Sequence, residues 1–275
     1  MKKVTEGISA GYLKMVALII MFVDHVAATI IMCLASNTNH PLTQWIAALF
    51  GGDSLTMIEV YNVIATLYTT MRYIGRISFP IYCFFLVEGF VHTRSRKKYM
   101  RRLVALALIS EVVFDLAFYG KIFYIFHQNV FFTLALGLGL IWILDVFWEK
   151  KTWNILQKIG LSILCSVGIL LLAELARTDY SSYGVLAICV MYMVHKMVRE
   201  RIKLWAPIVL ASGIAILCLC DFSEVWAFLG LPLFCFYQGK KGWGAKWFFY
   251  FFYPVHLALL ALACLLLGLK EFTIF

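Results

Sequence analysis

Three ionisable side chains stand out because they lie inside runs of sequence that are otherwise apolar. Asp24 and His25 are adjacent within the run Tyr12–Ala35, and His256 follows Pro254 near the end of the chain. An ionisable group at bilayer depth costs about 3 kcal/mol on insertion scales, so each one needs a reason. Histidine, whose ordinary pKa is about 6.5, suits the removal of a proton from a nucleophile. We therefore interpret His25 as a candidate general base, oriented by Asp24 directly or through water.

Further polar residues are spaced so that they share helix faces. Glu88 and His92 are separated by four positions, as are Glu111 and Asp115, so each pair is predicted to lie on one helix face. Each pair also has a structural interpretation: the first lies near a membrane surface and can extend toward water, and the second can be half of an ion pair. The candidate substrate-binding residues are Glu88, His92, Glu111, Asp115, Asn129, Asp179, Tyr253 and His256.

Arg76 is the third candidate catalytic residue. It precedes Pro80 by four positions, and because proline has no N–H, the carbonyl of Arg76 lacks its usual helical donor and a local bend is predicted. We expect the guanidinium of Arg76 to stabilise negative charge that develops during a reaction, or to bind an acceptor carboxylate.

The densest charged segment offers a binding site for an anion. The candidate ligand-binding cations are Arg94, Arg96, Lys97, Lys98, Arg101 and Arg102, together with Lys240 and Lys241. Such a tract can anchor the chain against anionic lipid headgroups, or its arginine forks can hold a phosphorylated cytoplasmic ligand such as coenzyme A. The Gly239–Gly242 segment has no Walker signature, so nucleotide hydrolysis is unsupported.

The elements that must position these residues are membrane helices. The 275-residue chain is 63% hydrophobic and 14% charged, whereas soluble domains are about 45–50% apolar and about 25% charged. About nine spans are predicted, at Tyr12–Ala35, Ile77–Val91, Leu103–Tyr119, Val130–Phe147, Ile159–Ala176, Tyr183–Met197, Leu204–Cys220, Val225–Tyr237 and Trp247–Leu269. The predicted class is all-α, a polytopic transmembrane bundle that forms one domain over residues 1–275.

The distribution of basic residues predicts the orientation of the bundle. With the amino terminus in the cytoplasm and the carboxyl terminus outside, 19 of the 24 Lys and Arg residues fall in cytoplasmic segments. A crossing by residues 57–71 would reverse this pattern, so residues 37–73 are predicted to form an outer amphipathic or re-entrant helix. Because the positive charge lies in short tracts between spans, it indicates topology rather than a nucleic-acid partner. The eight cysteines show no zinc-ligand spacing, and no metal site is expected.

Taken together, these motifs resemble the TraX family of conjugal-pilin acetylases. The resemblance covers nearly the whole chain: Leu13-Lys14 with Asp24-His25, Gly75–Ile81, Leu86–Phe90, His92–Ser95, Tyr99–Leu103, Asn129–Thr133, Asp179-Tyr180 with Gly184, Tyr237 with Gly239-Lys240, and Phe249-Tyr250 with Tyr253–Leu257. The family is similar to the acyltransferase-three superfamily and to membrane N-acetyltransferases that act on lysosomal glucosamine, in which an early-span histidine, matching His25, is important.

The resemblance implies transfer of an acetyl group from cytoplasmic acetyl coenzyme A to an amine or hydroxyl. The expected acceptor is a peptide, a glycan or a small amine, and the expected location is the bacterial cytoplasmic membrane, in contact with its lipids. A proton-coupled transporter that uses the intramembrane Asp, Glu and His as a relay is the alternative. A passive scaffold is a third reading, and it leaves the buried charges unexplained.

Overall fold

The computed structural model describes residues 7–51, 55–242 and 246–273, with the backbone alone at 246 and 247. Its elements are α1 (Ala10–Val26), the π-helix η1 (Ala27–Ile31), α2 (Met32–Ala35), α3 (Pro41–Gly51), α4 (Met57–Gly75), α5 (Ser78–His92), α6 (Arg96–Tyr119), α7 (Val130–Glu149), α8 (Ile155–Leu175), α9 (Ser181–Val198), α10 (Trp205–Leu217), the 3₁₀-helix η2 (Phe222–Gly230), α11 (Leu231–Cys235) and α12 (Lys246–Leu266). Within the described ranges β-structure is limited to three isolated bridges, so the predicted all-α class is confirmed.

Local sequence signals explain where several helices begin. Ser9, Thr56, Asn129 and Asn154 precede α1, α4, α7 and α8, and each side chain accepts a hydrogen bond from a backbone N–H of the first turn. Such caps satisfy amides that have no partner inside the helix. Gly120 ends α6 with a φ of 66°, a left-handed conformation that suits glycine.

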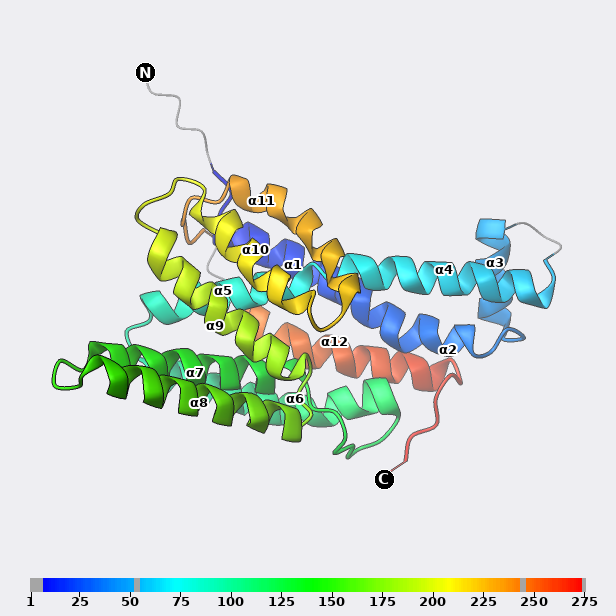
Figure 1. The fold of residues 1–275 in the computed structure, drawn as a ribbon. Coiled ribbons are helices and arrows are strands. Elements are labelled where there is room, and N and C mark those ends of the chain that lie inside the picture. Colours follow the sequence, from blue (N-terminus) through cyan, green and yellow to red (C-terminus); the bar gives the residue numbers. More distant parts are fainter. Residues whose placement is uncertain (1–6, 52–54, 243–245, 274–275) are drawn as a thin grey trace, which may run out of the picture.

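Two long rods lie antiparallel and side by side in the bundle (Figure 1). The first is α1–η1–α2, and the second is α4 followed by α5 after a turn at Arg76 and Ile77. By length and composition α4 and α5 together form one candidate span, Met57–His92, and segment 57–71 lies within it. The outer amphipathic or re-entrant helix expected within residues 37–73 stays a prediction: α4 packs along α1, η1 and α2, and α3 crosses the far end of α4 (Figure 1).

The core is centred on α5, and burial differs sharply between helices. Eleven of the 15 residues of α5 are buried, and Phe84 packs with Trp205, Phe234 and Tyr237. By contrast, only Ala173 of α8 is buried, because α8 packs only on one side, against α7 and α9. The apolar surface of α8 is what a helix facing lipid presents.

Among the described residues, six helical stretches are long and apolar enough to cross a membrane. They are Ala10–Ala35, Met57–His92, Val130–Glu149, Ile155–Leu175, Ser181–Val198 and Phe248–Leu266. The predicted count of nine is not established. The other three predicted spans correspond to α6, which carries Glu111 and Asp115 besides its basic first turns, to the 13-residue α10, and to η2 with α11.

The two ends of the bundle are distinguished by which loops meet there. At the end that carries the amino terminus, Ile8 pairs with Tyr237, and the N–H of Ala10 donates to the carbonyl of Lys240 at 2.8 Å. At the opposite end, Gln128 pairs with Thr178, and Lys121 pairs with Thr273 near the carboxyl terminus. We call these the N-terminal end and the C-terminal end.

Candidate active site

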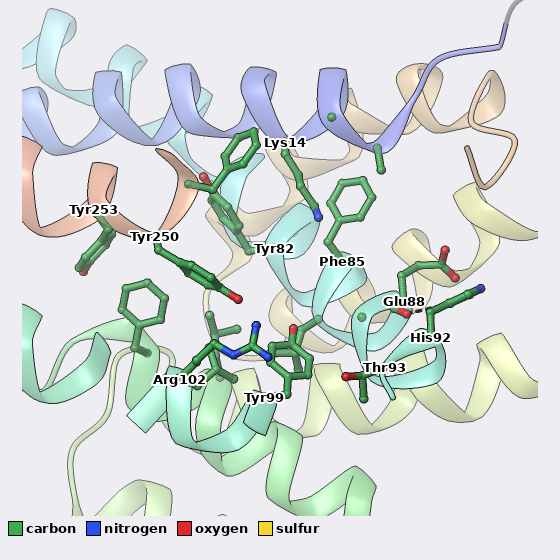
Figure 2. Close-up of a pocket in the computed structure, with 18 of the residues that line it drawn as sticks. Lys14, Tyr82, Phe85, Glu88, His92, Thr93, Tyr99, Arg102, Tyr250 and Tyr253 are labelled. Atoms are coloured by element: carbon green, nitrogen blue, oxygen red, sulfur yellow. Dashed lines mark hydrogen bonds between the residues drawn. The ribbon is translucent and has the colours of Figure 1, made fainter. Parts of the chain in front are cut away.

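A cavity of about 740 Å³ enters the bundle from the N-terminal end, between α1, α5, α6, α7 and α12. Three cationic side chains line it: Lys14 from α1, Arg102 from α6 and Lys241 from the segment before α12. Figure 2 shows Lys14 and Arg102 entering this space from opposite walls, and Nζ of Lys14 lies 4.9 Å from the ring centroid of Phe85. We call this space the cationic cavity. Its walls are otherwise mostly aromatic and aliphatic, as is typical of ligand pockets.

The basic tract of α6 is divided by the helix face on which each residue lies. Tyr99, Arg102 and Leu103 line the cavity, because positions three and four apart share a face. The other predicted anion ligands of the tract do not line it. Arg94, Lys97, Lys98 and Arg101 are exposed, and Arg96 pairs with Asp145 of α7 at 2.6 Å. Similarly, Lys241 lines the cavity and its neighbour Lys240 does not.

Glu88 is held in the cavity wall by partners from two other elements. Its carboxylate accepts from Nε2 of His195 at 2.7 Å and from the hydroxyl of Tyr237 at 3.2 Å, and Arg199 lies 3.9 Å away. His92 also lines the cavity, and its Nδ1 donates to the carbonyl of Glu88 at 2.9 Å. Glu88 and His92 therefore meet at one wall, as their spacing predicts.

Two histidines that lie 231 residues apart in sequence meet between α1 and α12. Nδ1 of His25 and Nε2 of His256 are 2.6 Å apart, and the two ring planes are parallel within 1°. Nδ1 of His256 lies 2.7 Å from the carbonyl of Phe252. His256 is only 3% exposed, and the rings of Phe118 and Tyr253 lie edge-on against His25. We call His25 and His256 the histidine pair.

The histidine pair lies directly beyond the inner end of the cationic cavity. His25 does not line the cavity, but Met21, one helical turn earlier on α1, does. Tyr253 lines the cavity and contacts both histidines, with ring centroids 5.8 Å from His25 and 5.5 Å from His256. The ring of Tyr253 thus forms the boundary between the cavity and the pair.

Asp24 and Arg76 are engaged with partners other than His25. Asp24 pairs with Arg72 of α4 at 2.7 Å, and among the hydrogen bonds of the described residues it makes none to His25; orientation of His25 by Asp24 stays a prediction. The two side chains diverge because neighbours on a helix point about 100° apart. Arg76 pairs with Asp221 at 3.0 Å and with Glu224 at 2.9 Å, so η2 occupies its guanidinium.

The remaining predicted substrate-binding residues gather toward the C-terminal end. Asn129 donates to Glu111 and, at 2.8 Å, to the carbonyl of Ala107, while Asp115 accepts from the N–H of Tyr124 at 2.8 Å. These bonds hold the loop before α7 against α6, so both Glu111 and Asp115 have structural partners. Among the described residues, one oxygen each of Glu111 and Asp115 is buried without a hydrogen-bond partner.

The loop before α9 reaches the same region through a strained backbone. Arg177, Tyr180 and Ser181 have positive φ values of 53°, 61° and 47°, which non-glycine residues seldom adopt and which often mark functional sites. Asp179 in this loop lies 3.6 Å from Nε2 of His127, and its carboxylate raises the pKa of that imidazole although burial opposes the shift. Three acids, Glu111, Asp115 and Asp179, therefore lie near His127 at this level, whereas cations line the cavity.

Sequence reasoning missed several residues of this site. Lys14 was counted only as a topology signal, although a lysine within the first span was itself a sign of a polar interior. His195 was a comparable signal within the Tyr183–Met197 span. Arg72, Asp221 and Glu224 lie outside or at the ends of the predicted spans, and only the packing of α4 against α1 and η2 reveals their partners. Among the described residues, no three potential metal ligands gather.

The apolar helices and the cavity at one end indicate a polytopic membrane protein with an internal cavity. The family model described as TraX protein matches residues 9–264, and the chain belongs to this family. The chain is also 32% identical over 216 residues to the probable fimbrial assembly protein FimC, serogroup H1, of Dichelobacter nodosus, with 71% of this chain and 83% of that protein covered. No solved structure matches. The predicted resemblance is thereby confirmed.

Proposed function

We propose that the protein transfers an acyl group, in the simplest case acetyl, from coenzyme A in the cationic cavity to an amine or hydroxyl acceptor, with His25 as general base. One observation carries the proposal: a cavity lined by three cations ends at Tyr253, which touches the histidine pair. When the anionic part of a ligand binds the cations at one end of this cavity, the other end of the ligand is brought close to His25. Proximity of this kind contributes strongly to the rate of group transfer.

The lining of the cavity fits the two chemical parts of the donor. Lys14, Arg102 and Lys241 suit phosphate groups, because charge-assisted contacts to phosphate are among the stronger hydrogen bonds. The apolar and aromatic wall suits the uncharged pantetheine arm, and the volume lies within the range of about 300–1,000 Å³ typical of ligand sites. Among the described residues of the lining Glu88 is the one acid, and it is already engaged with His195 and Tyr237.

The chemistry assigned to His25 is a single proton transfer in each direction. His25 takes a proton from the acceptor amine as the new C–N bond forms, and returns it to the thiolate as the C–S bond breaks. Tyr253 is placed to donate a hydrogen bond to the developing oxyanion, because it both lines the cavity and contacts His25. This role was predicted for Arg76, whose guanidinium is occupied by Asp221 and Glu224.

The direction of transfer follows from the charge at the two ends. We place the N-terminal end in the cytoplasm of a bacterium, because the loops there carry most of the Lys and Arg residues, and coenzyme A enters from this side. The carboxyl terminus is then outside, where the acidic groups face an amine-bearing acceptor. FimC is named for fimbrial assembly. We propose that the acceptor here is a subunit of a surface fimbria or pilus.

Binding of coenzyme A to the purified protein tests the proposal, and the chain offers matched controls. Arg102→Gln and Lys241→Gln should each weaken binding of coenzyme A about tenfold, because each removes a charge-assisted contact. The neighbours Arg101 and Lys240 do not line the cavity, so Arg101→Gln and Lys240→Gln should leave the affinity within about twofold. Equal losses of coenzyme A affinity in a cavity variant and its neighbouring control would show that these cations act through lipid headgroups or the overall electrostatic field, and not by direct contact with coenzyme A.

Acyl transfer itself tests the role of His25. His25→Ala should lower the rate of acetyl transfer at least about 100-fold, the usual contribution of a general base, with coenzyme A affinity unchanged. Full activity in folded protein would remove His25 as the base. Protein that binds no coenzyme A at all would favour the proton-coupled transporter.

A further inference from the structure

The histidine pair fixes which nitrogen of each ring carries a hydrogen. A carbonyl oxygen can only accept, so Nδ1 of His256, 2.7 Å from the carbonyl of Phe252, must be the donor. In neutral His256 the other nitrogen, Nε2, is then an acceptor. His25 must therefore donate through Nδ1 across the 2.6 Å contact. Neutral His25 is left with its lone pair on Nε2.

From this chain of donors we infer that His256 is a positioning residue, which holds His25 in the one tautomer whose Nε2 can accept a proton. The inference rests on the proposed function, because it assigns a task to His256 within the reaction of His25. The geometry resembles the general arrangement in which a catalytic base is oriented by a third group hydrogen-bonded to its second nitrogen. Here a neutral imidazole and a backbone carbonyl take the place of a carboxylate.

The other hydrogen bonds near His25 are consistent with Nδ1 as the donor to His256 and Nε2 as the proton acceptor. Among the hydrogen bonds of the described residues, the imidazole of His25 uses only Nδ1, and the backbone carbonyl of His25 accepts from the hydroxyl of Thr29 at 2.6 Å. Nε2 therefore has no hydrogen-bond partner among these residues. Asp24, the nearest acid in sequence, is paired with Arg72 and does not compete for Nδ1.

The backbone departs from regular α-helix close to each histidine of the pair. The π-helix η1 begins at Ala27, two residues after His25, and π turns are frequent at functional sites. On α12, Pro254 lies two residues before His256 inside the helix, where it removes one backbone donor. The ring of Phe252 lies 4.8 Å from that of His256, at an interplanar angle of 19°, and limits its rotation.

When His25 accepts a proton at Nε2, the geometry requires no rearrangement. The ring becomes an imidazolium with hydrogens on both nitrogens, and its Nδ1–H continues to donate to Nε2 of His256. That bond becomes charge-assisted and therefore stronger. His256 thus stabilises the protonated base without itself gaining or losing a proton.

The direct test reads the tautomer of His25 by ¹⁵N NMR of histidine-labelled protein in detergent, with its signals assigned by comparison with His25→Gln. Wild-type protein should show one neutral tautomer, with hydrogen on Nδ1. In His256→Phe, which keeps a ring but has no acceptor, that single tautomer should be lost. His256→Gln, whose amide oxygen can accept, should retain it in part. A mixture of tautomers in the wild type would overturn the inference.

A kinetic test separates positioning from packing. With acetyl coenzyme A and a short peptide that has a free amino terminus, His256→Phe should lower kcat about 100-fold and leave KM for the donor within about twofold, since loss of an orienting partner can cost up to about 10⁴ in kcat. His256→Gln should recover at least about tenfold of that loss. Phe118→Leu, which changes an apolar neighbour of the same ring, should stay within about threefold of wild type.

The possible failures are distinguishable. If His25→Ala abolishes transfer while His256→Phe keeps the wild-type kcat and pH profile, the positioning role is wrong and the proposed base stands. If His25→Ala is fully active, the proposed base falls, and the NMR result still decides whether His256 fixes the tautomer. Thermal melting of each variant shows whether a loss reflects unfolding.

Discussion

Replacing Gly75 with alanine should break the ion pair that joins α1 to α4. A Cβ at Gly75 would lie 2.0 Å from Oδ1 of Asp24, 2.4 Å from its Cγ and 2.5 Å from its Cβ, so rotation of the carboxylate alone cannot relieve the clash and α1 must also move away from α4. To restore ordinary contact at about 3.4 Å, the carboxylate must retreat by about 1.4 Å. That shift is about half of the 2.7 Å that joins Asp24 to Arg72, so the pair cannot keep its geometry.

The expected energy is the difference between two opposing effects. Alanine is favoured over glycine inside a helix by about 1 kcal/mol. Disrupting the pair should cost about 2 kcal/mol, between the values for exposed and fully buried pairs, because the side chains of Arg72 and Asp24 are 26% and 17% exposed. The net destabilisation of Gly75→Ala is therefore about 1 kcal/mol.

Gly168 on α8 is the matched control, since nothing lies within 4 Å of a Cβ built there. Gly168→Ala should stabilise the protein by up to about 1 kcal/mol. The two variants should then differ by about 2 kcal/mol, or about 4–8 °C in melting temperature for a chain of this size, measured in detergent. In an Asp24→Ala background Gly75→Ala no longer disrupts an ion pair, so its cost should fall by about 2 kcal/mol. Equal melting temperatures for the two glycine variants would refute the argument.

Three further results are expected. Asn129→Ala should destabilise the protein by about 2–4 kcal/mol, because it removes the cap of α7 and a buried partner of Glu111. Asn154→Ala, at the exposed cap of α8, should cost about 1 kcal/mol or less. Chemical denaturation of both variants compares the two free energies of unfolding. Because the pKa of His127 is raised in the folded protein, its protonation contributes stability at pH values below the ordinary pKa of about 6.5, and this stability is lost as the pH rises through the pKa of the folded state. Between about pH 6 and pH 8.5 the melting temperature of the wild type should therefore fall by more than that of Asp179→Asn. Coenzyme A affinity should decrease as salt rises from about 0.1 M to about 1 M, where the screening length shortens from about 10 Å to about 3 Å, and calorimetry at both salt concentrations tests this.

The sequence predicts the chemical character of the site well and its pairings poorly. Each histidine of the pair was identifiable as a polar residue inside an apolar run, because that placement is costly whatever the fold. Their contact joins positions 25 and 256, and no local pattern encodes which helices pack together. The same limit explains why Arg72 was not recognised as the partner of Asp24.

Helical periodicity separates the basic residues that line the cavity from those that do not. The basic tract before and within α6 was treated as one group of ligands, yet Tyr99, Arg102 and Leu103 already share a face by their spacing. The count of spans was less predictable, because α6 mixes charge with apolar residues and η2 adopts a 3₁₀ conformation. Hydropathy alone cannot decide whether such short or polar segments cross the bilayer.

The small buried fraction of α8 has a consequence for how this protein changes over generations. With only Ala173 buried, almost any apolar residue satisfies the requirements of α8, and most substitutions there will be neutral. On α5 a change of one methylene alters the packing of several neighbours. Lineages that descend from a common ancestor should therefore diverge fastest along α8 and slowest along α5, and a library of random apolar sequences in place of α8 should still yield folded protein.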